Sequence, residues 1–341
     1  MSNSYNTKLK ASKENEHPFA VYVRILGKGK TGSRSLNRQE AFSAMQMILA
    51  GQTTDVQLGA FLMLLRVKEE SHEELAGFVD AVRARIDLTT SIHVDLDWSS
   101  YAGKKRQLPW FILSALLLAD NGVRVFMHGA NGHTQGRLYT ELVLQQLNIP
   151  VATDLVEVQK QLDTTQFSFM PLNYLCPELQ NIIDLRAEFG LRSPVNTLSR
   201  LINPLLAEHS LQSVFHPSYG DTHQRAAELL GQTHSAVFKG EGGEIERKPE
   251  ASCLVKMVRQ GQTTDELWDK LIDGRQDKPS SLNTQELVDV WRGTADNQYG
   301  KLAIIGTAAI ALKLMNKIDS KMEALKLADQ LWNQRNKNRL N

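Results

Sequence analysis

The spacing of apolar residues changes near residue 92, and this change constrains the fold more than any other feature of the sequence. From Ser35 to Ile86, apolar side chains recur at the period of an α-helix. From Ile92 to Trp98, apolar residues alternate with polar ones, which is the period of a half-buried β-strand. The sequence therefore predicts a helical region followed by a region that contains a sheet.

Capping signals divide the helical region into three helices. Asn37, Thr54 and Ser71 are each followed three residues later by Glu or Gln, a pattern typical of the first turn of a helix. Each pair opens a segment whose apolar residues share one face. We therefore expect a small helical bundle.

Strands and helices alternate after the change of period. We expect strands over Ile92–Trp98, Val123–Met127 and Ile149–Ala152, and helices over Pro109–Asp120, Arg137–Leu147 and from Tyr299 onward. This alternation predicts an α/β fold with a mostly parallel sheet covered by helices. The segment GQTTD occurs at Gly51 and again at Gly261, and each copy is expected to precede a helix.

Composition excludes several classes of protein. At 341 residues, 42% hydrophobic and 23% charged, the chain fits about two folded domains and not a disordered one. The longest nearly unbroken apolar run, Trp110–Ala119, is far shorter than the roughly 20 residues that span a bilayer. With no apolar segment typical of a secretion signal, we expect a cytoplasmic protein without a membrane partner, in which Cys176 and Cys253 are reduced thiols.

Basic residues gather in three places although the net charge is only +1. Residues 1–38 contain eight Lys or Arg and two Glu, and Lys104–Arg106 form a basic triplet. Arg335, Lys337 and Arg339 form a basic tail, which we interpret as solvated surface. None of the nine histidines lies in a sequence spacing typical of a metal site.

Two long blocks of sequence resemble the anthranilate phosphoribosyltransferases and the related nucleoside phosphorylases. The first is Glu40–Arg83, and the second runs from Leu185-Arg186 through Asn196 to Asn203-Pro204-Leu205. The resemblance implies a helical domain joined to a larger α/β domain, a ligand cleft between them and a homodimer formed through the helical domain. It implies these boundaries: a flexible leader at 1–17, a helical dimerisation domain at 18–91 plus 186–206, an α/β domain at 92–185 plus 207–334, and the basic tail at 335–341.

The sequence departs from the enzymes where their substrate binds. The glycine-rich diphosphate loop of the family, GTGGD, is replaced by Ser100–Lys105, in which only Gly103 remains. The adjacent Asp-Glu metal motif is replaced by a segment whose carboxylates, Glu241 and Glu244, are separated. Because a cradle of backbone N–H groups depends on glycines, we expect ordinary phosphoribosyl transfer to be impaired.

The loop that replaces the cradle resembles the SYxGxRxQ loop of the YbiB-type branch of the family, which is associated with nucleic-acid binding. We therefore predict a DNA- or RNA-binding protein that needs no cofactor, contacts phosphates and has little sequence preference. The predicted contact residues are Arg24, Lys28, Lys30, Arg34, Tyr101, Gly103, Lys104, Lys105 and Arg106. Of the aromatic residues, Tyr101 is a candidate for base stacking, whereas Trp110 fits a core position better.

Two other functions stay open. One is a Mg²⁺-dependent phosphoribosyltransferase with an unusual acceptor, in which Glu241 and Glu244 would hold the metal and Arg186 would contact the acceptor. By resemblance, His128, Gly129, Arg186 and Asn196 would line its cleft. The other is a protein whose partner is a protein and whose basic segments are only solvated surface.

Overall fold

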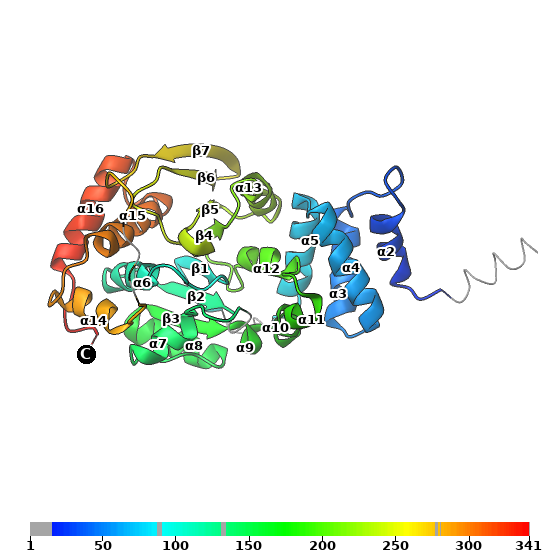
Figure 1. The fold of residues 1–341 in the computed structure, drawn as a ribbon, viewed down its shortest axis with the longest axis horizontal. Coiled ribbons are helices and arrows are strands. Elements are labelled where there is room, and N and C mark those ends of the chain that lie inside the picture. The colour runs from blue at the N-terminus through cyan, green and yellow to red at the C-terminus, as the bar shows by residue number, and fades with distance from the viewer. Residues whose placement is uncertain (1–15, 87–90, 131–133, 277–278, 280, 341) are drawn as a thin grey trace, which may run out of the picture.

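The computed structural model describes residues 16–86, 91–130, 134–276, 279 and 281–340. Figure 1 shows a helical domain beside a larger α/β domain. Most of the predicted leader at 1–17 lies outside the described residues. Within them, no helix is both long and apolar enough to cross a bilayer.

Residues 16–86 of the helical domain contain four helices, and all three predicted capping pairs are confirmed. The side chains of Asn37, Thr54 and Ser71 accept the backbone N–H three residues on, and the Glu or Gln found there bonds back to the capping residue. These pairs open α3 (Arg38–Leu49), α4 (Asp55–Lys68) and α5 (His72–Arg83). An additional helix, α2 (Ala20–Gly27), packs on α4 through the ring pair Phe19–Phe61. The N-terminal basic segment is therefore partly helical.

The α/β domain is built on a seven-stranded sheet with the order β3-β2-β1-β4-β5-β6-β7. Five strands are parallel, and β6 and β7 form an antiparallel hairpin at one end. This confirms the predicted α/β fold. The strands are β1 (Leu96–Ser100), β2 (Val125–Gly129), β3 (Phe167–Pro171), β4 (His209–Val214), β5 (His234–Lys239), β6 (Cys253–Arg259) and β7 (Gln262–Trp268).

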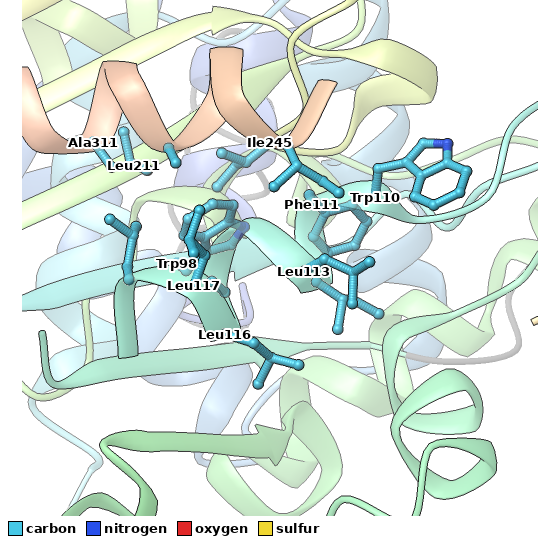
Figure 2. Close-up of a cluster of buried hydrophobic side chains, with 14 of the residues drawn as sticks. Trp98, Trp110, Phe111, Leu113, Leu116, Leu117, Leu211, Ile245 and Ala311 are labelled. Atoms are coloured by element: carbon cyan, nitrogen blue, oxygen red, sulfur yellow. The ribbon is translucent and has the colours of Figure 1, made fainter. Parts of the chain in front are cut away.

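Apolar helices cover one face of the sheet. There α6 (Trp110–Asp120) packs on α15 (Gln298–Leu314), and α16 (Lys321–Gln334) covers α15. In Figure 2, Trp98 of β1 and Leu211 of β4 lie against Leu117 and Ala311 of these helices. Trp110 is 1% exposed, which confirms its expected place in the core.

The remaining helices of the described residues are α7 (Thr140–Gln146), α8 (Leu155–Thr165), α9 (Leu172–Leu175), α10 (Pro177–Asp184), α11 (Arg186–Phe189), α12 (Val195–Leu198), α13 (Tyr219–Leu229) and α14 (Gln285–Arg292). Of these, α7 and α14 add buried residues to the core formed by α6 and α15, whereas α8 and α13 contribute to the second core cluster, which includes the helical domain. The segment from α10 to α12 returns to the helical domain, where α12 contacts α5 (Figure 1). Two short turns of 3-10 helix, η1 (Ser199–Leu201) and η2 (Glu241–Gly243), lie near the domain junction.

One arginine of the helical domain bonds directly to the α/β domain. Arg38 donates to the carbonyl oxygen of Leu229, the last residue of α13, at 2.7 Å, whereas Arg83 donates to that of Ile202 at 2.6 Å within the segment 186–206 that returns to the helical domain. Helix α13 also packs directly on α5. These contacts fix the helical domain against the edge of the sheet.

Three predicted elements differ from the structure. The first strand begins at Leu96, because Ile92 and Val94 pack among residues of the helical side and pairing with β2 starts at Leu96. Residues 149–152 form no strand and join the sheet only where Ala152 donates to the carbonyl of Phe169. The second GQTTD segment precedes no helix.

That second segment instead turns and opens a strand. Gln260 and Gly261 have φ angles of 50° and 75° and link β6 to β7. Two successive residues with positive φ suit a tight hairpin, because such a turn follows the twist of the strands. The same five-residue segment therefore caps a helix at Gly51–Asp55 and belongs to a hairpin at Gly261–Asp265.

The predicted solvated tail is wrong for Arg335 and Arg339, whereas Lys337 is exposed as predicted. The guanidinium of Arg335 lies 3.7 Å from the ring centroid of Trp332 and donates to backbone carbonyls of α14. Arg339 pairs with Asp120, and Leu340 is 2% exposed. Arg335, Arg339 and Leu340 are therefore part of the packed α/β domain, because the two arginines have aromatic, carbonyl and carboxylate partners.

Candidate nucleic-acid interface

Loops at the carboxyl ends of β1, β4 and β5 meet beside the helical domain. They comprise residues 101–107, 215–218 and 240–252. Parallel strands bring their carboxyl ends to one edge, where ligands of open α/β sheets commonly bind. The loops therefore form the first place to look for function.

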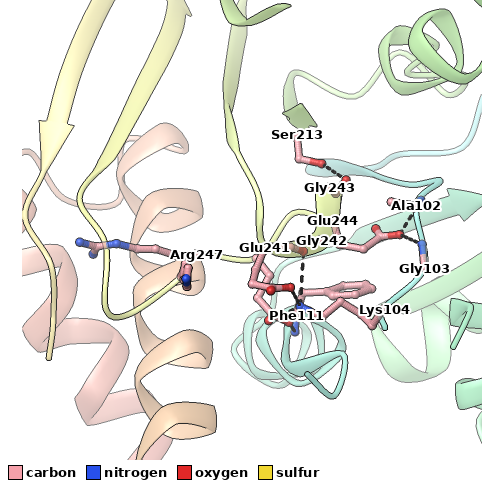
Figure 3. Close-up of polar contacts among 12 residues, drawn as sticks. Ala102, Gly103, Lys104, Phe111, Ser213, Glu241, Gly242, Gly243, Glu244 and Arg247 are labelled. Atoms are coloured by element: carbon pink, nitrogen blue, oxygen red, sulfur yellow. Dashed lines mark hydrogen bonds and ion pairs between the residues drawn. The ribbon is translucent and has the colours of Figure 1, made fainter. Parts of the chain in front are cut away.

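The backbone N–H groups after β1 hold a side chain of the protein. Oε1 of Glu244 accepts from the N–H of Ala102 at 2.7 Å and of Gly103 at 2.5 Å (Figure 3). Its other carboxylate oxygen accepts from the hydroxyl of Ser100 at 2.9 Å. Because Glu244 is fully buried, its carboxylate fills the cradle as an anionic ligand would.

The Glu244 loop is fixed from behind by Arg200. This buried guanidinium donates to the carbonyl oxygen of Gly243 at 2.6 Å and to the carbonyl and hydroxyl oxygens of Ser213. Burial lowers the pKa of Arg200, and the nearby charge of Glu244 opposes that shift. The tight loop also requires Gly240, where a Cβ atom would lie 1.6 Å from the carbonyl oxygen of Glu244.

Lys104 is buried, which corrects its prediction as a phosphate contact. Its Nζ lies 2.6 Å from carboxylate oxygens of both Glu241 and Glu246. Burial alone would lower the pKa of Lys104, but the two carboxylates reverse the shift and raise it. Burial in turn raises the pKa of Glu246 to about 7, although Lys104 opposes this. Lys104 therefore neutralises internal acids and is not available to a polymer at the surface.

Tyr101 is buried as well, which corrects its prediction as a stacking residue. Its side chain is 0% exposed, and its hydroxyl lies 2.6 Å from Nδ1 of His128. Gly103 is buried beside it with a φ of 68°, a conformation that favours glycine. Both residues shape the loop from within.

Lys105 and Arg106 are exposed and line a cavity of about 730 Å³ at the same strand ends. The cavity contains four more cations, namely Arg137, Lys239, Lys248 and Lys256, and the carboxylate of Glu241. Lys248 and Lys256 already have acidic partners. Within the described part of the chain, Lys105, Arg106 and Lys239 have none. The cavity therefore presents positive charge that its own acids leave uncompensated.

A second cavity, of about 430 Å³, lies between this edge and the helical domain. It contains Arg66, Arg192 and Arg200 with one acid, Glu69. Burial lowers the pKa of Arg192 to about 10, and repulsion from Arg137, Arg200 and Arg186 adds to the shift. Asn196 also lines this cavity, as the resemblance implies. We use "the cleft" for the two cavities together, which share Val214 and Phe215.

The N-terminal basic segment does not meet the cleft within one chain. Arg24 pairs with Glu16, and Arg34 pairs with Glu40 at 2.6 Å, so two of its cations are already neutralised. Lys28 and Lys30 are exposed at the outer end of α2. Figure 1 shows α2 on the side of the helical domain away from the α/β domain. The two predicted basic clusters are therefore separate surfaces.

The other residues implied by resemblance divide between core and cleft. His128 is 0% exposed and lies 3.3 Å from Asp97, so it belongs to the core and not to the cleft lining. At Gly129, a Cβ atom would lie 2.0 Å from the carbonyl oxygen of Ser100, so the close approach of β2 to β1 requires glycine. Arg186 bonds to the hydroxyl of Thr134 near the cleft.

Glu241 and Glu244 do not fit a Mg²⁺ site in this structure. The carboxylate of Glu244 is saturated by two N–H groups and a hydroxyl, and that of Glu241 faces the ammonium of Lys104. Mg²⁺ prefers oxygen ligands, whereas these oxygens are surrounded by hydrogen-bond donors. The metal pair expected for an enzyme is therefore not formed.

The structure brings together one histidine pair that sequence spacing does not indicate. His209 and His234 open the paired strands β4 and β5, and their rings stack with centroids 4.9 Å apart. With Glu208 they offer ligand atoms within 4.8 Å of one another. This cluster lies at the amino ends of the strands, at the edge opposite the cleft.

The helical domain, the sheet and the cleft define a glycosyl transferase-type chain, and the comparisons agree. The helical bundle domain of the glycosyl transferase family matches residues 22–86, and the α/β domain of that family matches residues 112–334. The chain belongs to this family.

Its relatives include proteins with and without a stated activity. It is 29% identical to the protein YbiB of Escherichia coli over 70% of this chain and 76% of that one. It is 31% identical to an anthranilate phosphoribosyltransferase of Moorella thermoacetica, over 86% and 89% of the two chains. The anthranilate phosphoribosyltransferase structure from Thermus thermophilus superposes with a TM-score of 0.76 at 22% identity, covering 91% and 94%. The predicted family and its YbiB-type resemblance are confirmed.

Proposed function

We propose that this protein binds single-stranded DNA or RNA through its phosphates in the cleft, with little sequence preference. The observation that carries the proposal is the cradle filled by Glu244 beside a cleft in which Lys105, Arg106 and Lys239 have no acidic partner among the described residues. The filled cradle disfavours a small diphosphate there. The uncompensated cations favour a polyanion that lies along the open cleft.

Three further expectations belong to the same proposal. Binding needs no cofactor, because the contacts are between side-chain cations and phosphates. The protein is a homodimer formed through the helical domain, and Lys28 and Lys30 extend the binding surface of the dimer. Its location is the cytoplasm. Size-exclusion chromatography coupled to light scattering measures the mass in solution, and the mass of a monomer would reject the proposed homodimer.

The binding test is fluorescence anisotropy of a labelled single-stranded oligonucleotide at several salt concentrations. Phosphate contacts release counterions, so log affinity is expected to fall linearly with log salt concentration, and competitors of scrambled sequence are expected to compete equally. Absence of binding at low salt would reject the proposal.

A matched pair of variants locates the site. Lys105→Ala/Lys239→Ala removes two cleft cations, whereas Lys317→Ala/Lys326→Ala removes two exposed lysines from the far end of the α/β domain. The net charge changes equally in both. Loss of two phosphate contacts lowers the magnitude of the salt slope by about 1.4 for a single strand. Equal slopes for the two variants would show that only net charge matters and would exclude the cleft.

The second candidate function is phosphoribosyl transfer to an unusual acceptor. The similarity to the Moorella enzyme along most of both chains favours it. Arg186 beside Thr134 would then contact the acceptor. Phosphoribosyl diphosphate with Mg²⁺ would raise the unfolding temperature of such an enzyme in a concentration-dependent way. No shift is expected for the nucleic-acid-binding protein, because Glu244 holds the cradle.

A further inference from the structure

Phe215 occupies an unusual position for an exposed aromatic residue. It follows β4 directly, its side chain is 50% exposed, and it is shared by both cavities of the cleft. Single exposed apolar residues are common on protein surfaces. This one differs because it stands in a concave, cationic surface and half of it is exposed there.

The ring is also held in place. A Cβ atom at Gly243 would lie 3.5 Å from Cδ2 of Phe215, an ordinary van der Waals distance, so the ring lies close to the loop backbone at Gly243. On another side the ring contacts His216 edge-on, with centroids 4.9 Å apart at 75°. A supported ring loses little freedom when a flat ligand is added, so it is suited to stacking.

Cations lie on both sides of this ring. The larger cavity provides Lys105, Arg106 and Lys239, and the smaller one provides Arg66 and Arg192. The acids that share these cavities are Glu241, which faces Lys104, and Glu69. The order is therefore cationic, aromatic and cationic, which matches phosphate, base and phosphate along a single strand.

We propose that an unpaired nucleobase stacks on Phe215 while the phosphates on its two sides contact the cations of the two cavities. This inference rests on the proposed function and adds to it a requirement for unpaired bases. Every base has a π-face, so such stacking supports binding without sequence preference. In a duplex both faces of an internal base are already stacked, so Phe215 is expected to add no stacking energy to the binding of duplex DNA.

The test combines a change in the protein with a change in the ligand. Anisotropy titrations compare the wild type and Phe215→Ala on a single-stranded oligothymidylate and on an abasic oligonucleotide of the same length and charge. Because stacking of one base contributes to affinity, we expect Phe215→Ala to bind the oligothymidylate about tenfold more weakly than the wild type. On the abasic strand the two proteins are expected to bind equally, and the salt slopes are expected to be unchanged.

A control variant separates stacking from general loss of apolar surface. Met322→Ala removes an exposed apolar side chain from α16, far from the cleft, and is expected to bind both ligands like the wild type. Phe215→Trp keeps an aromatic face and is expected to retain the affinity that Phe215→Ala loses.

The outcomes distinguish the two proposals. If the wild type binds neither oligonucleotide, the proposed function itself fails. If the wild type binds but Phe215→Ala binds oligothymidylate equally well, only the stacking inference fails. An equal loss on the abasic strand would also overturn it, because the effect would then not depend on a base.

Discussion

Replacing Glu244 by alanine should convert a filled cradle into an empty one. The change leaves three donors without their acceptor: the N–H groups of Ala102 and Gly103 and the hydroxyl of Ser100. At about 1–1.5 kcal/mol for each lost bond, we expect the free energy of unfolding to fall by about 3–5 kcal/mol. Glu244→Gln keeps an acceptor oxygen, so its free energy of unfolding should fall by less than that of Glu244→Ala.

The emptied cradle should then accept an anion from solution. Inorganic pyrophosphate offers oxygens to the same donors, and a ligand at a hundred times its dissociation constant adds about 2.7 kcal/mol to the free energy of unfolding. Urea unfolding at increasing pyrophosphate concentration, with and without Mg²⁺, measures this. Only Glu244→Ala should be stabilised by pyrophosphate, and sulfate at equal ionic strength is the control for general salt effects.

One result would refute the reasoning directly. If pyrophosphate stabilised the wild type as much as Glu244→Ala, the carboxylate would not be competing for the cradle. The second candidate function would then become the better one. A variant as stable as the wild type would instead show that the three hydrogen bonds contribute little.

Two other predictions concern stability. Burial raises the pKa of Glu70 from 4.5 to about 7 in the folded protein, so protonation favours folding: the contribution is full below pH 4.5 and is lost as the pH rises through 7. This corresponds to about 3 kcal/mol, so Glu70→Gln should flatten the dependence of the free energy of unfolding on pH between about pH 4.5 and 7, and an unchanged slope there would contradict the assignment. Gly129→Ala places a Cβ atom 2.0 Å from the carbonyl oxygen of Ser100 and should destabilise the protein by more than about 4 kcal/mol, measured by thermal unfolding. The control is Gly59→Ala, because its added Cβ would lie at an ordinary contact distance of 3.6 Å from a ring carbon of Phe189. Equal effects of the two changes would count against the steric explanation.

Local sequence signals predicted the fold well where the interactions are local. The two members of each capping pair, at Asn37, Thr54 and Ser71, lie within one helical turn of each other, so the local amino-acid sequence is enough to identify them. The strand wrongly expected at 149–152 shows the limit, because a short apolar segment becomes a strand only if a neighbour pairs with it. The repeated GQTTD shows the same dependence on context.

The site was harder to predict because its chemistry depends on distant contacts. Lys104 and Lys105 are adjacent in the sequence, yet one is buried between Glu241 and Glu246 and the other is exposed in the cleft. Those glutamates are more than a hundred residues away, so no local pattern distinguishes the two lysines. Phe215 and Lys239 were missed, although both lie where parallel strands end, and that rule could have identified them.

The bond from Arg38 to Leu229 and the packing of α13 on α5 cross the domain boundary and bear on how a ligand enters and leaves. Many enzymes close two domains over a small substrate and exclude water around it. Such closure is of no use for a polymer that continues beyond the protein at both ends, because the strand must pass through the rim. A cleft held at a fixed width, by contrast, admits a strand from the side at any point along its length. Under the proposed function, association would then require no domain movement, and a bound protein could move along the strand by exchanging one phosphate for the next.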